Sequence, residues 1–324
     1  MTSFRATVSN CLWSLVPAAL ICLFSSVASG QNYPTKPIRI VTSETAASND
    51  FVARVIAPAI AEPLGQSVVV DNRASAVTAG IVSKSAPDGY TLLVTTGVVW
   101  LLPFLQTTSY DPLRDFVPIT LATSSPNIVV VHPAVAANSV KELIGLAKAR
   151  PGQLNYGSGT TGSASHLAAE LFKAMAGINI VHIPYKSAGP AVIALIGGQV
   201  QMMIATSSSV ATHIKSGKLK ALAVTSAQPS AMFPGMPTAS ASGLPGYEAA
   251  SFVGVFVPGK TPTAIVTRLN QEIVRVLNRP EVKERLFGVG MDVVGGTSAQ
   301  SIATIKTDMA RMGKVIKDAG IHAN

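Results

Sequence analysis

Cysteine is almost absent from this chain of 324 residues, and both cysteines, Cys11 and Cys22, lie within the segment 1–30. This segment has the pattern of a signal peptide. Arg5 is followed by an apolar stretch from Leu12 to Phe24 and by small residues that end at Gly30. We therefore expect an exported, periplasmic protein that is cleaved near Gly30. The mature chain would then have no cysteine and no disulfide.

Long apolar runs are also scarce. The stretch from Leu12 to Phe24 is shorter than the roughly 20 residues that span a bilayer, although an uncleaved anchor is the alternative. The later apolar runs are shorter still or are interrupted by charges and turn residues. The high hydrophobic fraction, 48%, therefore indicates a soluble core. The part of the chain that follows Gly30 is long enough for two domains of ordinary size.

Acidic residues are few, since 16 Asp and Glu face 25 Lys and Arg for a formal net charge of +9. Such an excess is compatible with nucleic acid, an acidic surface or an anionic solute as the partner. The basic residues are scattered, and aromatic residues make up 6% of the chain, too few for stacking on bases. We therefore expect no nucleic-acid partner, whereas attraction of small anions stays compatible with the charge.

A glycine-rich stretch from Tyr156 to His166 carries the strongest functional signal. It follows a strand-like run, Gln153 to Tyr156, and precedes a run from Leu167 to Ala176 with apolar residues at helical spacing. Glycines let the backbone bend, and the first amides of a helix lack internal partners. This strand, turn and helix start is predicted to hold a carboxylate through Gly159, Thr160, Thr161, Gly162, Ser163 and His166.

The same letters spell G-x-G-x-x-G, which is the fingerprint of a dinucleotide fold. That fold needs an acidic residue at the end of the next strand, and the run from Ile178 to Tyr185 has none. A nucleotide site is therefore disfavoured, while a purely structural turn stays open. We expect no cofactor. His166 and Glu170 stand at i and i+4 without a third ligand, so we expect no metal site either.

Catalysis is a second hypothesis, from another class of function. Ser163 and Ser165 are close in sequence to His166, and a periplasmic serine hydrolase would use one of them as its nucleophile. The sequence has no G-x-S-x-G elbow, and closeness in sequence is not the geometry of a triad. We therefore expect a binding protein, not an enzyme.

Two further turns are predicted at the same edge of the sheet. A strand from Pro37 to Val41 leads to a helix from Asp50 to Leu64, and a strand from Tyr90 to Thr95 follows later. Apolar strands that alternate with helices predict a parallel α/β sheet, whose ligands bind at the carboxyl ends of the strands. The candidate residues in these turns are Ser43, Thr45, Ala47, Ser48, Thr96 and Gly97. Alternatively, the hydroxyls of Ser43, Thr45 and Ser48 could cap the helix that begins near Asp50.

Two extended runs, 124–132 and 250–257, bracket a central α/β block. A chain that leaves one domain, builds a second and returns makes two crossings, which is a hinge topology. We predict one lobe from 31–128 and 253–324 and a second lobe from 129–252, with the ligand in the cleft. Second-lobe candidates at strand ends are Ser187, Ala188, Gly189 and Thr206.

Motifs along the whole mature chain resemble one family. They are YPTKPIRI (33–40), APDGYTLL (86–93), YDPLRDFVPI (110–119), VHIPYK (181–186), GKLKALAVTS (217–226) and GKVIKDAGI (313–321). The chain thus resembles the extracytoplasmic solute receptors of the tripartite tricarboxylate transporter family, also called Bug proteins. The resemblance implies a type II periplasmic binding protein whose two lobes close on a small carboxylate, and we expect it to be a monomer. The resemblance further implies uptake through the membrane subunits of such a transporter, or sensing.

The match to the family is uneven. Residues 157–166 match its carboxylate-binding turn, and residues 186–190 match its second-lobe turn. The turn before Asp50 lacks the family's glycines, and Ala205-Thr206 stands where the family often has Asp-Asn. A ligand ammonium would lose its carboxylate partner there, so this departure from the family disfavours amino acids as the ligand.

Overall fold

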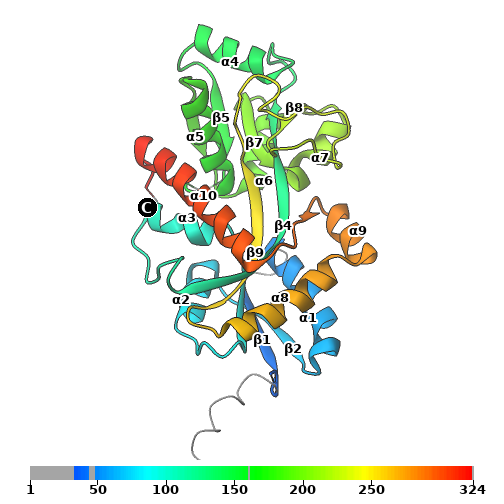
Figure 1. Ribbon diagram of the computed structural model, residues 1–324. Coiled ribbons are helices and arrows are strands. Elements are labelled where there is room, and N and C mark those ends of the chain that lie inside the picture. Colours follow the sequence, from blue (N-terminus) through cyan, green and yellow to red (C-terminus); the bar gives the residue numbers. More distant parts are fainter. Residues whose placement is uncertain (1–32, 44–47, 160, 323–324) are drawn as a thin grey trace, which may run out of the picture.

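The computed structural model describes residues 33–43, 48–159 and 161–322. The described chain forms two α/β lobes one above the other, joined at their centre by two long strands (Figure 1). The predicted signal peptide lies outside the described residues.

Lobe 1 is the lower one in Figure 1 and contains the start of the described chain. Its first part comprises β1 (Ile38–Thr42), α1 (Ser48–Leu64), β2 (Val68–Asn72), α2 (Ser75–Ser83), β3 (Thr91–Thr96), α3 (Val98–Leu105) and the start of β4 (Phe116–Val131). The chain returns to it with β9 (Ala250–Pro258), α8 (Thr263–Leu277), α9 (Pro280–Gly288), β10 (Asp292–Val293) and α10 (Ser298–Asp318).

Lobe 2 is built from the intervening chain. After the end of β4 it comprises α4 (Val140–Ala149), β5 (Asn155–Ser158), α5 (Ala164–Ala176), β6 (Val181–Pro184), α6 (Ala188–Ile196), β7 (Met202–Thr206), α7 (Ser207–Lys215) and β8 (Lys220–Val224). Most of these follow the predicted ranges. The helix α3 was not predicted, because its sequence VVWLLPFL is apolar throughout and has no amphipathic period.

The strands β4 and β9 are the two predicted crossings. From Phe116 to Pro126, β4 pairs with β9; from Asn127 to Val131 it pairs instead with β7 and β8 of lobe 2. The predicted two-lobed α/β fold with two connecting extended segments is thus confirmed. The lobe boundaries predicted from the sequence lie close to this change of partner and stay a prediction.

The expectation of a parallel sheet was wrong for its centre. The strand order is β2-β1-β3-β9-β4-β7-β5-β6, with parallel pairs at both outer parts and antiparallel pairs through the centre. The reason is topological, because one crossing strand leaves lobe 1 and the other returns, so they run in opposite directions where they meet.

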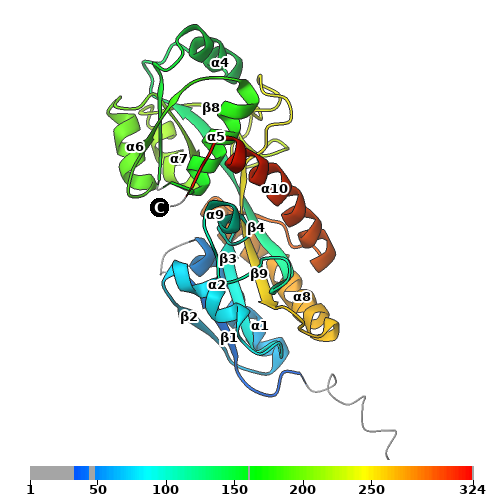
Figure 2. The ribbon, with the colours of Figure 1, turned by 90° about the vertical axis from the view of Figure 1, so that its left-hand side faces the viewer.

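The helix α10 connects the lobes a second time. A capping box of Thr297 and Gln300 begins this helix. From there α10 runs along α3 (Figure 1) and ends beside α5 of lobe 2 (Figure 2). Its apolar residue Ile316 belongs to one buried cluster together with Trp100 of α3 and Phe172 of α5. The lobes therefore share a continuous core on the α10 side. No helix within the described ranges is both long and apolar enough to cross a membrane.

Candidate ligand-binding site between the lobes

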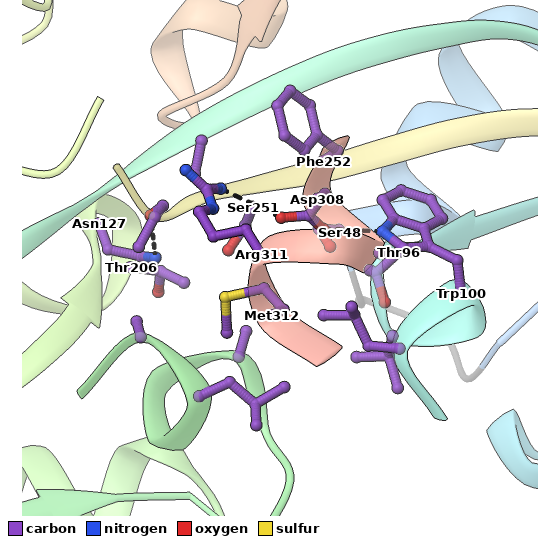
Figure 3. A pocket seen from close by; sticks show the side chains of 18 residues that line it. Ser48, Thr96, Trp100, Asn127, Thr206, Ser251, Phe252, Asp308, Arg311 and Met312 are labelled. Carbon is purple, nitrogen blue, oxygen red and sulfur yellow. Dashed lines mark hydrogen bonds and ion pairs between the residues drawn. The ribbon is translucent and has the colours of Figure 1, made fainter. Parts of the chain in front are cut away.

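Four helices begin at one place between the lobes. The helices α1 and α5 begin at Ser48 and Ala164, and α3 and α7 follow Gly97 and Thr206. All four residues line the same cavity, where Figure 3 shows Ser48 and Thr206 on opposite sides. The first N–H groups of a helix have no partner within it, and the helix dipole places partial positive charge there. The cavity therefore offers anion-binding donors from both lobes.

This cavity has a volume of about 190 Å³ and lies where the crossing strands meet α3, α5 and α10 (Figure 3). It is lined by Ser48, Thr96, Gly97, Val98, Trp100, Leu101, Asn127, Ala164, Leu167, Ala168, Thr206, Ala249, Ala250, Ser251, Phe252, Asp308, Arg311 and Met312.

The crossing strands supply two polar side chains to the cavity. The Asn127 amide donates from Nδ2 to the carbonyl of Ala249 at 2.7 Å, which ties β4 to the start of β9. Its Oδ1 and the Oγ of Ser251 are buried and have no hydrogen-bond partner in the described chain. Because buried polar atoms are normally paired, such atoms mark a place where a bound group or ordered water completes the bonding.

The opposite wall carries an ionic cluster. The Trp100 indole donates from Nε1 to Asp308 Oδ2 at 2.8 Å, and Arg311 Nη2 donates to Asp308 Oδ1 at 3.1 Å. Arg311 Nη1 lies 3.5 Å from a carboxylate oxygen of Glu248, in the segment before β9. The guanidinium on this wall is therefore held between two carboxylates.

Four predicted site residues, Ser48, Thr96, Gly97 and Thr206, line the cavity. Ser48 and Thr96 come from lobe 1 and Thr206 from lobe 2, so the structure brings together turns that lie far apart in the sequence. A ligand role for these residues stays a prediction.

The glycine-rich turn is held by its own side chains. Gly159 donates its N–H to Ser165 Oγ at 3.1 Å, and Gly162 donates its N–H to His166 Nδ1 at 3.0 Å. Ser163 caps α5 by accepting from the His166 N–H. Two amide N–H groups of the turn, those of Gly159 and Gly162, are therefore bonded within the turn. Ala164, the first residue of α5, lines the cavity.

The same turn sits at a close approach of the lobes. Gly162 has φ +80°, and a Cβ there would lie 2.9 Å from Leu105 Cδ1 of α3. A Cβ at Gly159 would lie 3.6 Å from the N of Ala188, so the predicted stretch from Ser187 to Gly189 lies beside the turn. These residues and the exposed Thr161 are not among those that line the cavity. Their ligand role stays a prediction, and Thr160 lies outside the described residues.

His166 supports the turn from within lobe 2. It is 4% exposed and stacks on His182 with ring centroids 4.0 Å apart, and His182 stacks on Tyr156 at 4.8 Å. Burial, followed by the neighbouring His182, lowers the pKa of His166 to about 4, so the ring is neutral at pH 7. Its Nδ1 is occupied by the Gly162 amide. Its predicted contact with the ligand is untested.

The turn before α1 is organised by asparagines that sequence reasoning missed. Asn49 donates from Nδ2 to Thr42 and to Ser43, and Asn72 donates to the Ser43 carbonyl at 2.6 Å and to Asp50 at 2.8 Å. Ser43 is therefore 8% exposed and already bonded to Asn49. The other candidates of this turn, Thr45 and Ala47, lie outside the described residues.

Sequence reasoning also missed other polar and aromatic residues that line the cavity, namely Trp100, Asn127, Ser251, Asp308 and Arg311. The one available signal was Asn127, a polar residue at the head of the apolar run Ile128 to Val131. The ranges that the structure describes contain no group of three or more His, Cys, Asp or Glu side chains suited to a metal ion.

Residues 52–321 match the family described as "Tripartite tricarboxylate transporter family receptor". The chain belongs to this receptor family. BugT of Bordetella pertussis is 36% identical to it over 299 residues, 90% of this chain and 92% of BugT. A protein encoded in the tcbD-tcbE intergenic region of Pseudomonas sp. (strain P51) is 36% identical over 298 residues, 90% of this chain and 89% of that protein.

Solved structures agree with this membership. Rpa4515 of R. palustris, solved with adipate, is 34% identical and superposes with a TM-score of 0.75, covering 90% of this receptor and 99% of that chain. MatC of Rhodopseudomonas palustris, solved with bound malate, is 26% identical, with a TM-score of 0.72 and coverage of 88% of this receptor and 100% of that chain. The family consists of periplasmic solute-binding receptors, so the chain is a receptor and not an enzyme. The alternative of a serine hydrolase was wrong.

Proposed function

We propose that this receptor captures a small carboxylate in the cavity between its lobes. The observation that carries the proposal is the convergence of the starts of α1, α3, α5 and α7 on one cavity. The adipate and malate in the two related structures support a carboxylate as the ligand class. A carboxylate is held by N–H donors at helix starts without needing a paired cation.

Closure follows from where these donors lie. The helices α1 and α3 belong to lobe 1, and α5 and α7 belong to lobe 2. A ligand shifts a two-state equilibrium through contacts that it makes better in one state. A carboxylate that bonds to donors of both lobes therefore favours the closed arrangement, which the membrane subunits of a tripartite tricarboxylate-type transporter, or a sensor, would recognise. We further propose export with cleavage near Gly30 and a monomeric receptor.

The ligand class is tested by calorimetry and thermal unfolding of dialysed receptor with adipate, malate and simple monocarboxylates. A ligand at 100 times its Kd stabilises the folded state by about 2.7 kcal/mol, which raises the melting temperature measurably. Absence of binding by every small acid tested would refute the proposed function.

The donor position is tested by the variant Ala164→Pro. Proline at the first helical position is compatible with the helix and removes one N–H, and the extended Ser163 before it tolerates proline. Loss of one hydrogen bond to a charged group, about 1.5–3 kcal/mol, predicts roughly 10- to 100-fold weaker binding. The matched control is Thr263→Pro at the exposed first position of α8. Equal affinities of the two variants would place the carboxylate elsewhere.

The cavity itself is tested by fluorescence. The chain has two tryptophans, Trp13 in the predicted signal peptide and Trp100 in the cavity wall. In a chain that begins after Gly30, Trp100 is the single indole, and a bound acid should change its emission. A saturating acid that calorimetry detects but that leaves the emission unchanged would show binding at another place.

A further inference from the structure

The walls of the cavity differ in how many polar side chains they carry. The strand and turn side contributes hydroxyls and an amide from Thr96, Asn127, Thr206 and Ser251, together with the apolar Ala249, Ala250 and Phe252. The helices α3, α5 and α10 contribute an apolar wall, apart from Asp308 and Arg311, formed by Val98, Trp100, Leu101, Ala164, Leu167, Ala168 and Met312. A ligand that fills the cavity must therefore present a large apolar surface to these three helices.

The two charges on this wall are paired, while Arg311 Nε is buried and has no hydrogen-bond partner in the described chain. Among the described residues that line the cavity, Arg311 is the one cation and Asp308 the one anion. Arg311 contacts Asp308 at 3.1 Å and Glu248 at 3.5 Å, so its positive charge is shared by two carboxylates. The side chains of Arg311 and Asp308 are 27% and 14% exposed, so solvent screens this cluster only in part. A ligand carboxylate placed against α10 would face a net negative cluster.

The volume of the cavity limits the size of the apolar part of the ligand. Its volume is about 190 Å³. A cavity of roughly 150 Å³ with apolar lining is large enough to take up benzene. A six-membered ring therefore fits against α3, α5 and α10, with its carboxylate directed to the helix starts.

We infer that the preferred ligand is a monocarboxylate with an uncharged, ring-sized apolar body, such as an arylcarboxylate. This inference rests on the proposed function and narrows it. One carboxylate is held by the helix-start donors, and the ring covers the apolar wall. A second carboxylate would be desolvated beside Asp308 and Glu248, which costs free energy. The one cation of the described lining, Arg311, already pairs with both carboxylates and has a single N–H, at Nε, left to donate.

The first test compares acids that differ in one feature, using the wild-type receptor and calorimetry. Hexanoate and adipate share a six-carbon chain and differ in the second carboxylate; benzoate and phenylacetate carry a ring; malate is short and polar. We expect a ring acid to bind most tightly, hexanoate to bind at least tenfold more tightly than adipate, and malate to bind most weakly. Adipate or malate binding more tightly than hexanoate and the ring acids would overturn this inference and leave the proposed function intact. Failure of all five acids would overturn both.

The second test adds a cation to the apolar wall. Met312 is 5% exposed and lines the cavity from α10. Met312→Lys should raise the affinity for adipate relative to hexanoate at least tenfold, while the control Met312→Leu should leave that ratio unchanged. An unchanged ratio in a folded Met312→Lys receptor would show that the ligand body does not lie against α10. If this variant does not fold, Ala168→Phe takes its place, because it fills the apolar wall from α5. Ala168→Phe should weaken the binding of phenylacetate at least tenfold. An unchanged affinity would show that the ring does not lie against this wall.

Discussion

The indole of Trp100 and the carboxylate of Asp308, 208 residues apart in sequence, are joined by a hydrogen bond of 2.8 Å. Trp100 is 1% exposed, and the other oxygen of Asp308 accepts from Arg311. Because Arg311 also reaches Glu248, the contacts run from α3 through α10 to the segment that enters β9. These polar contacts join α10, which forms one wall of the cavity, to α3 and to the segment before β9.

Trp100→Phe should therefore destabilise the folded receptor. The change leaves Asp308 Oδ2 without its donor in a poorly solvated place, which costs about 1–3 kcal/mol, and it also removes part of a buried ring. Urea unfolding and the melting temperature measure the effect, which should amount to several degrees.

The control for that variant is a double-mutant cycle with Asp308→Leu. If the hydrogen bond contributes as expected, the double variant loses less unfolding free energy than the two single variants added together, by about 0.5–3 kcal/mol. Strict additivity would show that the contact between the indole and the carboxylate adds nothing to stability.

Gly162→Ala should lower the unfolding free energy of the receptor more than Gly177→Ala does. Gly162 and Gly177 both have positive φ, +80° and +59°, where alanine costs about 1–2 kcal/mol. At Gly162 the new methyl also meets Leu105 of α3 at 2.9 Å, whereas nothing lies within 4 Å at Gly177. Unfolding free energies should therefore rank Gly162→Ala as the less stable variant.

Adding Leu105→Ala to Gly162→Ala separates the backbone strain at residue 162 from the steric clash of the new methyl group with Leu105. The shortened side chain leaves room for the methyl group, so the double variant should lose less stability than the two single variants together. Equal stabilities of Gly162→Ala and Gly177→Ala would contradict the close approach of the lobes at this turn.

The receptor should lose stability as the pH falls from 7 to 4, in part because of His166. Its folded pKa, about 4, lies below the ordinary value of 6.5, so between these values the unfolded chain binds the proton more readily. This contribution is fully present above pH 6.5 and is lost toward pH 4, for a total of about 3 kcal/mol. Burial lowers the pKa of His182 as well, so its effect has the same sign.

His166→Asn isolates this effect, because the amide oxygen can still accept the Gly162 N–H but does not titrate. Urea unfolding at pH 7 and pH 4.5 should show a smaller loss for this variant than for the wild type. His322→Asn, at the exposed end of the described chain, is the control and should behave as the wild type does. Equal losses in all three proteins would rule out His166 as the group responsible.

The sequence predicted the helices with clear periods and the turns between strands and helices with good accuracy. It predicted Ser48, Thr96, Gly97 and Thr206 because they stand at strand ends, and the structure places these four around one cavity. It did not predict α3, whose residues are apolar on every side, nor the wall formed by Trp100. Such residues carry no local signal, because their role arises from what packs against them.

Local patterns along the chain determined the α/β class, the two crossings and the helix starts that present amide donors, because periodicity, capping and backbone freedom depend on near neighbours. The tertiary structure alone decided that the central strands run antiparallel and that α10 closes the cavity. It also decided that Arg311 lies between two carboxylates, of which Glu248 belongs to a distant part of the sequence. These outcomes require distant segments to pack together, and the free energy of that packing cannot be read from a short stretch of residues.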